Sequence, residues 1–293
     1  MRGTPLRSPV RLAPAAIAIA VTLAIVGAAH SLANAEVQTR AETISPPLDQ
    51  ARGDRGRPSR CPTRKQPGTK FRCIYGDRSA ERTVVVLGDS KVMQHFPALH
   101  DVALRRGVRL VGLMRAGCPP MVVTFAAACD RWRRRNLRRL RRVDPELVVT
   151  SSGVAYRVVR GGKRLNHSRS RPILYRAYVS LLRELVGAGA DVAVIVNPPR
   201  APRDPIACVR HNREQLDRCA FERGPRPYHN YVARAARSVK GARRVDVNQA
   251  ACPGAICPAV INDILVLRDR VHFTATYVRT LVDWLDARLP ALD

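Results

Sequence analysis

The stretch "RTVVVLGDSKVMQHFPAL", residues 82–99, has the pattern of a buried strand followed directly by a helix. Thr83 to Leu87 are apolar or β-branched, as in a strand covered on both faces, and Gly88-Asp89-Ser90 then forms a tight turn. Two interpretations of Ser90 fit this pattern. It is the N-cap of the following helix, or it is a nucleophile at the carboxyl edge of a sheet, where open α/β folds bind their ligands.

Short apolar runs alternate with helical patterns along the rest of the chain. Such alternation predicts parallel strands connected by right-handed crossovers, and therefore an α/β fold of three layers, α/β/α, with a mostly parallel sheet. The strands are expected at residues 83–87, 108–114, 147–151, 192–197 and 244–247. The helices are expected at residues 92–106, 131–142, 174–187, 228–239 and 275–289.

The N-terminus has the pattern of an export signal. Arg2, Arg7 and Arg11 precede the apolar run "LAPAAIAIAVTLAIVGAAH", and small residues follow at Ala33 and Ala35. This pattern predicts a signal peptide over residues 1–35, cleaved after Ala35. The alternative is an uncleaved membrane anchor, because the run is near the lower length limit of a spanning helix. In both cases the rest of the chain would be extracytoplasmic, secreted or anchored by one N-terminal segment.

The remainder divides into a linker and one domain. Residues 36–60 are polar, contain Pro and Gly and show no periodicity, which is typical of a flexible linker. Residues 61–293 fit a single α/β domain. Within this domain, residues 198–227 form a long insertion rich in Pro and Arg, which we expect to be a loop on the substrate side.

All eight cysteines follow the export signal and form four near-neighbour couples. In an oxidising compartment such couples predict disulfides. Short loops favour the pairs Cys61–Cys73, Cys118–Cys129, Cys208–Cys219 and Cys252–Cys257. Zinc is the alternative, but the sequence has no Cys-x-x-Cys motif and no clustered histidines beside the cysteines. We therefore expect no metal and no other cofactor.

The chain is strongly basic. Its formal net charge is +28, and loss of residues 1–35, with three Arg and no acid, leaves +25. The densest basic run, "RWRRRNLRRLRR" at residues 131–142, predicts a helix with a solvated face. Outside the cytoplasm such a face suits anionic wall polymers or lipid head groups. Export excludes nucleic acid as the partner.

A carboxylate and a histidine lie close together near the C-terminus. In "VLRDRVHFTATYVRTLVDWL", Asp269 precedes His272 by three residues, and Thr274 is a candidate N-cap of the last helix. A carboxylate at this spacing can reach the imidazole, fix its tautomer and stabilise its protonated form. The alternative is a surface Asp beside a helix-capping His.

Gly-Asp-Ser after the first core strand and Asp-x-x-His before the last helix together resemble the SGNH (GDSL-type) hydrolase superfamily of esterases and acyltransferases. The resemblance covers most of residues 80–290 and implies the flavodoxin-like SGNH sandwich. The chain resembles in particular the extracytoplasmic SGNH domain joined to acyltransferase-3 membrane proteins. The segments that carry this resemblance are "GDSKVMQHFPAL", "RAGCPPM", "DPELVVTSS", "VNPPRAPRDPIACV" and "CPGAICPAVINDILVLRDRVHFT".

The resemblance implies a role for each matched residue. Ser90 would be the nucleophile, His272 the general base and acid, and Asp269 the carboxylate that orients it. The backbone N–H groups of Ser90 and Gly117 would form the oxyanion hole. The family usually supplies a third donor from an Asn after the third strand, where this chain has "TSSGVAYR" without Asn. Lys91 occupies a position where this branch often has His.

The chemistry of the family moves an acyl group, commonly acetyl, onto or off a carbohydrate hydroxyl. The resemblance therefore implies an exported esterase or O-acyltransferase acting on an acylated envelope glycan. With one apolar segment, the chain would either hydrolyse existing esters or receive its acyl group from a separate membrane acyl-donor protein. The missing Asn favours an alternative, an inactive SGNH scaffold that binds anionic wall polymers through its basic face. A secreted lipase is a weaker alternative, because no segment of the sequence has the pattern of an apolar lid.

Overall fold

A central sheet of six strands organises the part of the chain that the structure describes. The computed structural model describes residues 38–56, 74–198, 200–223 and 230–292. The strands follow one another across the sheet in the order β1 (Ile74–Gly76), β3 (Arg109–Met114), β2 (Thr83–Gly88), β4 (Leu147–Ser151), β7 (Asp191–Val196) and β9 (Ala242–Asp246). Every neighbouring pair is parallel except β1 with β3. The predicted α/β fold with a mostly parallel sheet is confirmed.

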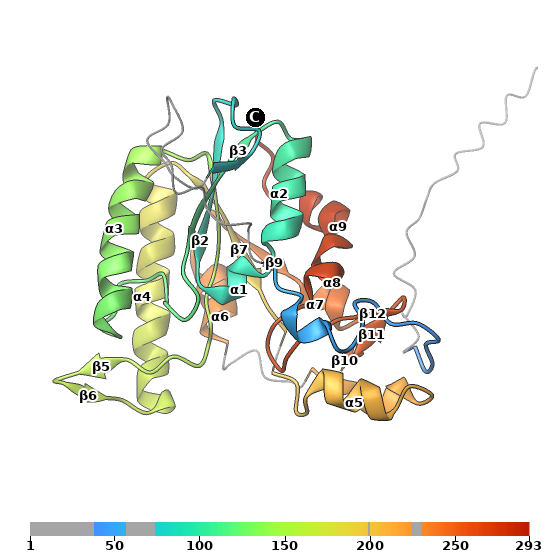
Figure 1. Ribbon diagram of the computed structural model, residues 1–293. Helices are drawn as coiled ribbons and strands as arrows, with labels where there is room; N and C mark the ends of the chain where they lie inside the picture. The colour runs from blue at the N-terminus through green and yellow to red at the C-terminus, as the bar shows by residue number, and fades with distance from the viewer. Residues whose placement is uncertain (1–37, 57–73, 199, 224–229, 293) are drawn as a thin grey trace, which may run out of the picture. The chain divides into compact units, whose positions relative to one another are not determined.

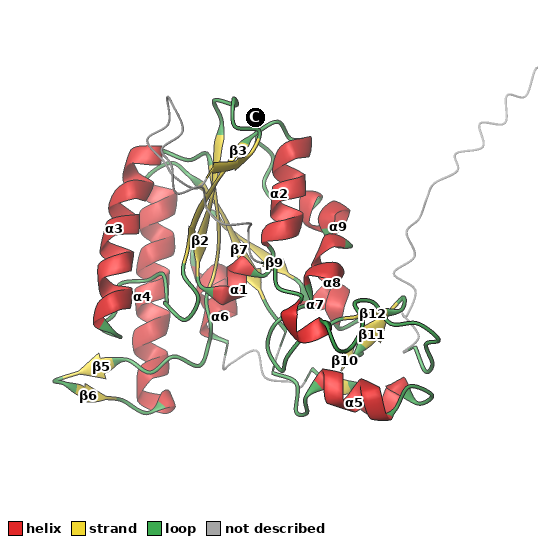
Figure 2. Ribbon diagram, in the orientation of Figure 1, coloured by secondary structure: helices red, strands yellow, loops and turns green. Residues whose placement is uncertain are grey.

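The remaining elements surround this sheet (Figure 2). The α-helices are α1 (Ser90–Met93), α2 (Phe96–Arg105), α3 (Ala127–Val143), α4 (His167–Gly187), α5 (Pro205–His211), α6 (Tyr231–Ser238), α7 (Asn248–Ala251), α8 (Ala275–Arg279) and α9 (Val282–Asp286). The 3₁₀ helices within the described ranges are η1 (Ala51–Gly53) and η2 (Leu216–Cys219). Short strands pair as β5 (Val159–Arg160) with β6 (Lys163–Arg164), β8 (Phe221–Glu222) with β10 (Ile256–Cys257), and β11 (Val260–Ile261) with β12 (Ile264–Leu265).

Two layers of helices bury the two faces of the sheet (Figure 1). Along β2, Val85 and Leu87 pack into the cluster formed with α3, α4 and α6, whereas Val84 and Val86 pack into the cluster formed with α2, α8 and α9. All four side chains are buried. Burial of each such side chain contributes about 1.5–3 kcal/mol, which explains why this strand is apolar at successive positions.

The strand order creates a crevice at the end of β2. Without the antiparallel edge strand β1, the order β3-β2-β4-β7-β9 is the doubly wound order in which the chain moves first to one side of its first strand and then to the other. Connections therefore diverge between β2 and β4, where ligands bind in such folds. Gly88 and Ser151 are partners at this point. Gly88 has φ +149°, and a Cβ on it would lie 2.5 Å from the carbonyl oxygen of Ser151, so only glycine fits here.

The expected helix at residues 92–106 is wrong at its start, because the structure has two helices there. α1 ends at Met93, Gln94 and His95 separate the helices, and α2 begins at Phe96. Pro97 occupies the first turn of α2 and cannot donate a backbone hydrogen bond to the preceding turn. The break turns the side chains of Gln94 and His95 into the protein, where both are buried.

The expected helix at residues 275–289 is also divided, into α8 and α9. Between them the N–H groups of Thr280 and Leu281 bond three residues back, to Tyr277 and Val278, as in a 3₁₀ turn. The Thr280 hydroxyl donates to the carbonyl of Tyr277 at 2.8 Å and competes with the regular helical pattern. At the start of α8, Thr274 accepts from the N–H of Tyr277, so Thr274 is the expected N-cap.

Residues 36–60 are expected to form a flexible linker, but the part that the structure describes, residues 38–56, is packed against other elements. Ala41, Leu48 and Ala51 are buried in an apolar cluster with residues of α5, η2, β11 and β12. Asp54 accepts hydrogen bonds from the backbone and the hydroxyl of Thr276 at the start of α8. The segment therefore packs on the domain. Its few apolar residues, widely spaced among polar ones, did not indicate this packing.

Three disulfides join sequential cysteines in the described chain. Cys118–Cys129, Cys208–Cys219 and Cys252–Cys257 have Cα–Cα distances of 5.2, 5.7 and 4.0 Å. These are the pairs expected from the sequence, and the third is shorter than the usual ~4.4–6.8 Å. Cys61 and Cys73 lie outside the described residues.

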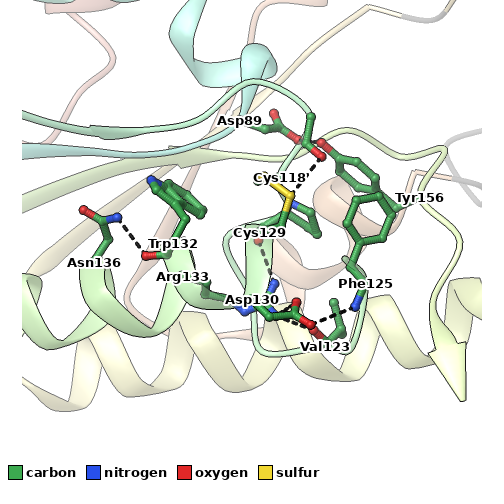
Figure 3. Close-up of a disulfide and its surroundings, with 12 residues drawn as sticks. Asp89, Cys118, Val123, Phe125, Cys129, Asp130, Trp132, Arg133, Asn136 and Tyr156 are labelled. Carbon is green, nitrogen blue, oxygen red and sulfur yellow. Dashed lines mark hydrogen bonds and ion pairs between the residues drawn. A yellow bond between two sulfur atoms is a disulfide. The ribbon is translucent and has the colours of Figure 1, made fainter. Parts of the chain in front are cut away.

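The basic run forms most of α3, and one of its arginines is not on the surface. Arg133 is buried; its guanidinium donates to the carbonyls of Pro119 and Val123 and forms an ion pair with Asp130 (Figure 3). Arg133 therefore holds the loop between β3 and α3 and is not part of a solvated basic face. Arg134 and Arg138 are exposed, as expected.

The predicted signal peptide or anchor, residues 1–35, lies outside the described residues. Within the described ranges, none of the helices combines the length and the apolar character that crossing a bilayer requires.

Candidate active site

Ser90, His272 and Asp269 lie in a hydrogen-bonded row at the carboxyl edge of the sheet. Ser90 begins α1 directly after β2, and His272 lies in the loop before α8. Ser90 Oγ lies 2.9 Å from His272 Nε2, and His272 Nδ1 lies 3.0 and 3.1 Å from the two carboxylate oxygens of Asp269. The structure thus brings together residues separated by up to 182 positions in the sequence.

The loop that carries His272 is shaped by Asp269 itself. The backbone N–H groups of Val271 and His272 both donate to Asp269 Oδ1 at 2.8 Å, which forms an Asx-type turn. Burial alone would raise the pKa of Asp269. The hydrogen bonds from His272 and the Val271 N–H, with the nearby charge of Arg268, instead hold the pKa of this carboxyl well below its ordinary value. Asp269 is therefore ionised and can stabilise a protonated imidazole.

The N-cap of α1 is Asp89 and not Ser90. Asp89 Oδ1 accepts from the N–H of Lys91 at 2.8 Å, the contact of a capping residue. Its other oxygen accepts from the N–H of Gly153 at 2.7 Å. The same oxygen accepts from the hydroxyl of Tyr156 at 2.6 Å (Figure 3). Because Asp89 satisfies the end of the helix, the Ser90 hydroxyl is left to face His272.

Asp89 is a fully buried carboxylate that joins two loops. Its burial raises its pKa, while the hydrogen bonds from Tyr156 and from the N–H groups of Gly153 and Lys91 oppose that rise. All three contacts are donors, which suits the ionised form. The network connects the turn after β2 to the loop after β4, and so fixes the position of Ser90 relative to the wall of the crevice.

A second polar cluster, mostly buried, contacts the backbone of Lys91, next to Ser90, and centres on Asn197, directly after β7. Asn197 Nδ2 donates to Ser151 Oγ at 2.9 Å and to the carbonyl of Lys91 at 3.2 Å. Asn197 Oδ1 accepts from Gln94 Nε2 at 2.5 Å and lies 2.8 Å from His95 Nε2. Burial lowers the pKa of His95 to about 4, so this imidazole is neutral near pH 7.

Sequence reasoning did not identify Asn197 or Gln94 as site residues. Asn197 had one available signal, because it is a polar residue at the carboxyl end of a buried strand, where ligand-binding edges of parallel sheets lie. No sequence signal marked Gln94 as a site residue, since its role depends on the helix break before Pro97.

The two expected oxyanion donors lie at the start of α1 and in the loop after β3. The Ser90 N–H is at the first position of α1, where a helix has no internal acceptor. Gly117 has φ +74° in the loop after β3, next to the disulfide of Cys118. Its neighbour Ala116 lines a small cavity together with Ser90, so this loop lies beside the serine.

No side chain of the segment Ser151–Gly153 replaces the missing Asn. Ser151 Oγ donates to the carbonyl of Ile195 at 2.7 Å, and Ser152 Oγ lies 2.9 Å from the hydroxyl of Tyr231. The backbone N–H of Gly153 is bonded to Asp89. These groups are therefore used within the protein.

Lys91 is partly buried beside the row of Ser90, His272 and Asp269. Its Nζ donates to the carbonyl of Val271, one residue before His272. Burial lowers the pKa of Lys91 to about 8, although the charges of Asp89 and Asp269 act to raise it. Lys91 therefore supports the loop of His272 and adds a positive charge next to Ser90.

A cleft of about 710 Å³ opens at Ser90 and His272. Its walls come from the loop after β4, the end of β7, α6 and β9. Part of the insertion, Arg200 and Arg223, also lines this cleft, as expected for a loop on the substrate side. A smaller cavity of about 260 Å³ reaches Ser90, Asp269 and His272 past Gly56. The row of three residues is thus accessible to a ligand.

The fold and this site define an α/β protein of the SGNH type. A family model described as "SGNH domain (fused to AT3 domains)" matches residues 60–286, and the chain belongs to this family. The search among curated proteins found no match.

The comparison with solved structures found proteins to which this chain is similar. The periplasmic domain of the lipopolysaccharide acetyltransferase of Salmonella ser. Paratyphi A is similar with a TM-score of 0.54 and 14% identity, over 71% of this chain and 83% of that chain. The acetyl xylan esterase AlAXEase is similar with a TM-score of 0.39 and 14% identity, over 70% of this chain and 98% of that chain.

Proposed function

We propose that this protein is an exported serine esterase or O-acyltransferase that removes or adds acyl groups, such as acetyl, on cell-envelope carbohydrate. The observation that carries the proposal is the row Ser90–His272–Asp269 at the mouth of an open cleft. Membership of the SGNH family supports chemistry on acyl groups.

The geometry supports a two-step mechanism. His272 Nε2 would accept the proton of Ser90 as its Oγ attacks the carbonyl carbon of an ester. Asp269 would hold Nδ1–H and stabilise the imidazolium, and the N–H groups of Ser90 and Gly117 would bind the negative oxygen of the tetrahedral intermediate. The intermediate collapses when His272 returns the proton to the sugar oxygen, which leaves an acyl group on Ser90.

The second step decides between hydrolysis and transfer. His272 would deprotonate either water, which releases the acid, or a sugar hydroxyl, which becomes acylated. Transfer requires that the hydroxyl compete with water at the acyl-enzyme. In a transferase the acyl group would come from a membrane protein, a role that the fusion of other family members to AT3 domains supports.

Export is part of the proposal. Disulfides form and persist in oxidising compartments, and the described chain contains three of them. The periplasmic domain with the same fold agrees with this location. We therefore propose that residues 1–35 direct the chain out of the cytoplasm, as a cleaved signal or as an anchor.

Hydrolysis of a small aryl acetate by the purified protein tests the proposal. We expect Ser90→Ala and His272→Ala each to remove nearly all activity, because residues of such a row act as one unit. A serine-directed phosphonate should label Ser90 and not Ser151 or Ser152. A folded protein that neither hydrolyses the ester nor takes the label, yet binds anionic wall polymer, would favour the scaffold alternative.

A further inference from the structure

The cleft continues from Ser90 into a groove between α6 and the edge strand β9. Asn230, the N-cap of α6, lines the cleft together with Ala233 and Arg237 of the helix, and their spacing of three and four places them on one side of it. On β9, Arg244 and Asp246 line it from one face of the strand. Because β9 is the last strand of the sheet, this groove lies at the edge of the fold.

The charges along this groove are mostly positive. Lys91, Arg200, Arg223, Arg237 and Arg244 line the cleft, whereas Asp246 is its single carboxylate among the described residues. Asp246 forms an ion pair with Arg244. Arg200 and Arg237 are exposed, and neither forms an ion pair with a described residue.

The positive residues are distributed along the cleft. Arg200 lines the same cleft as Lys91, which is next to Ser90. Arg237 is in the last turn of α6, and Arg244 is in the neighbouring strand. A ligand that extends from Ser90 along the groove would pass several cations.

Asn248 adds an independent feature that points to a ligand. Its side chain lines the cleft and the residue is 7% exposed, yet its Oδ1 has no hydrogen-bond partner among the residues that the structure describes. Its Nδ2 donates to Asp246 Oδ1 at 2.6 Å, and its backbone N–H bonds to the same oxygen. If the amide were flipped, Asn248 Oδ1 would lie against the carboxylate of Asp246, and two acceptors would be in contact. The amide orientation is therefore fixed, and the atom without a partner is the acceptor Oδ1. A buried acceptor without a partner is unfavourable. Oδ1 itself is enclosed, so a ligand hydroxyl would satisfy it after a small rotation of this side chain toward the cleft that it lines.

We infer that this groove binds an anionic sugar chain, with its carboxylate or phosphate groups on the arginines and a hydroxyl on Asn248 Oδ1. This inference rests on the proposed function and specifies its substrate class: the ester presented to Ser90 is on an acidic glycan. Guanidinium groups suit both carboxylates and phosphates, since they donate paired hydrogen bonds. A neutral glycan would leave Arg200 and Arg237 unused.

Binding to a Ser90→Ala variant tests the groove without turnover. The probes are an oligogalacturonate, which carries carboxylates, a glycerol phosphate oligomer, which carries phosphates, and a neutral galactan oligomer of equal length. We expect at least one anionic probe to bind about tenfold or more tightly than the neutral one, and to weaken with salt. The preferred probe identifies the anion.

Substitutions locate the contact. Arg237→Gln in the Ser90→Ala background should weaken the anionic probe about tenfold, because it removes a charged donor from the groove. Asn248→Asp should also weaken it, since a carboxylate there repels the anion. Arg243→Gln is the matched control: Arg243 is exposed on the same strand beside Arg244 but does not line the cleft. It should leave binding unchanged.

Equal binding of neutral and anionic probes, or equal effects of Arg237→Gln and Arg243→Gln, would overturn the inference. Its failure is distinguishable from that of the proposed function. If the wild-type protein hydrolyses an aryl acetate but the groove does not prefer anionic probes, only the inference about the groove is wrong. Anionic preference without any hydrolysis removes the enzyme and leaves the ligand of the groove.

Discussion

Gln94 Oε1 accepts a hydrogen bond from the backbone N–H of Phe273 at 2.8 Å. Gln94 follows the helix that begins with Ser90, and Phe273 follows His272, so this contact connects the proposed nucleophile to its base. The Gln94 amide also donates to Asn197 Oδ1 and to the carbonyl of Lys91. The distance between Ser90 and His272 therefore depends on a buried side chain that takes no part in the chemistry.

Replacing Gln94 tests whether its contact with Phe273 positions His272 relative to Ser90. Gln94→Met removes the acceptor of the Phe273 N–H, and we expect kcat/KM for an aryl acetate to fall about tenfold, because a loss of ~1.4 kcal/mol corresponds to that factor. Gln94→Glu keeps an acceptor and should retain more activity. Gln249→Met, at an exposed position, is the control. Equal activity of Gln94→Met and wild type would show that the contact does not position His272.

Asp269→Asn should lower activity less than Ser90→Ala does. An amide keeps a contact with His272 Nδ1 but favours the wrong tautomer and cannot stabilise the imidazolium. Some activity should remain, as the nucleophile and the oxyanion donors are intact. The measurement is kcat for an aryl acetate in both variants. A full loss in Asp269→Asn would indicate that the variant misfolds or that Asp269 shapes its loop more than the triad requires.

The same carboxylate predicts a pH dependence of stability. A carboxyl whose pKa is lower in the folded state contributes stability above its unfolded value of about 3.9, and this contribution is lost as the pH falls toward the folded value. The urea concentration at the unfolding midpoint of the wild type should therefore decrease as the pH is lowered from about 5 to about 3. It should fall less in Asp269→Asn. Parallel losses in the wild type and Asp269→Asn would contradict the lowered pKa.

The hydroxyl of Tyr156 should stabilise the fold through Asp89. Tyr156→Phe leaves a buried carboxylate with one donor fewer, and we expect a loss of about 1.5–3 kcal/mol in the free energy of unfolding. Tyr175→Phe is a matched control, because the Tyr175 hydroxyl bonds to Ser238 at 2.8 Å near the surface. It should lose no more than about 1 kcal/mol. Urea unfolding of both variants measures these losses. Equal losses of unfolding free energy would show that the contact with Asp89 is not what makes the Tyr156 hydroxyl stabilising.

The parts of this structure that were predictable from the sequence are those with a local pattern. The five core strands follow from short apolar runs, and their observed ends differ from the expected ones by at most two residues. Gly-Asp-Ser and Asp-x-x-His marked three residues that the fold brings together. Each of these signals is contained in a few consecutive positions.

What the sequence did not indicate depends on contacts between residues that are not adjacent in one short motif. For Asp89 the sequence indicates only a turn, since its partners Gly153 and Tyr156 come from another loop. The segment 38–56 had the composition of a linker, but it packs on apolar residues that follow more than a hundred positions later. Arg133 looked like one more surface charge in a basic helix, because its acceptors Pro119 and Val123 are backbone carbonyls.

The burial of Arg133 predicts that its substitution destabilises the fold more than loss of an exposed arginine in the same helix does. Arg133→Gln should lose the ion pair with Asp130 and the bonds to the loop after β3, and so lower the free energy of unfolding by about 1.5–3 kcal/mol. Arg134→Gln removes the same charge from an exposed neighbour and should change stability by less than about 0.5 kcal/mol.

The same loop contains Gly117 and Cys118, the first cysteine of a disulfide with Cys129 (Figure 3). If the Gly117 N–H is an oxyanion donor, loosening the loop should also reduce kcat, with up to about 10²–10³-fold loss when a donor is removed altogether. We therefore expect Arg133→Gln to lower kcat for an aryl acetate at a temperature where the variant remains folded, while Arg134→Gln keeps wild-type kcat. Unchanged kcat in a measurably destabilised Arg133→Gln would show that the loop holds the fold and not the oxyanion hole.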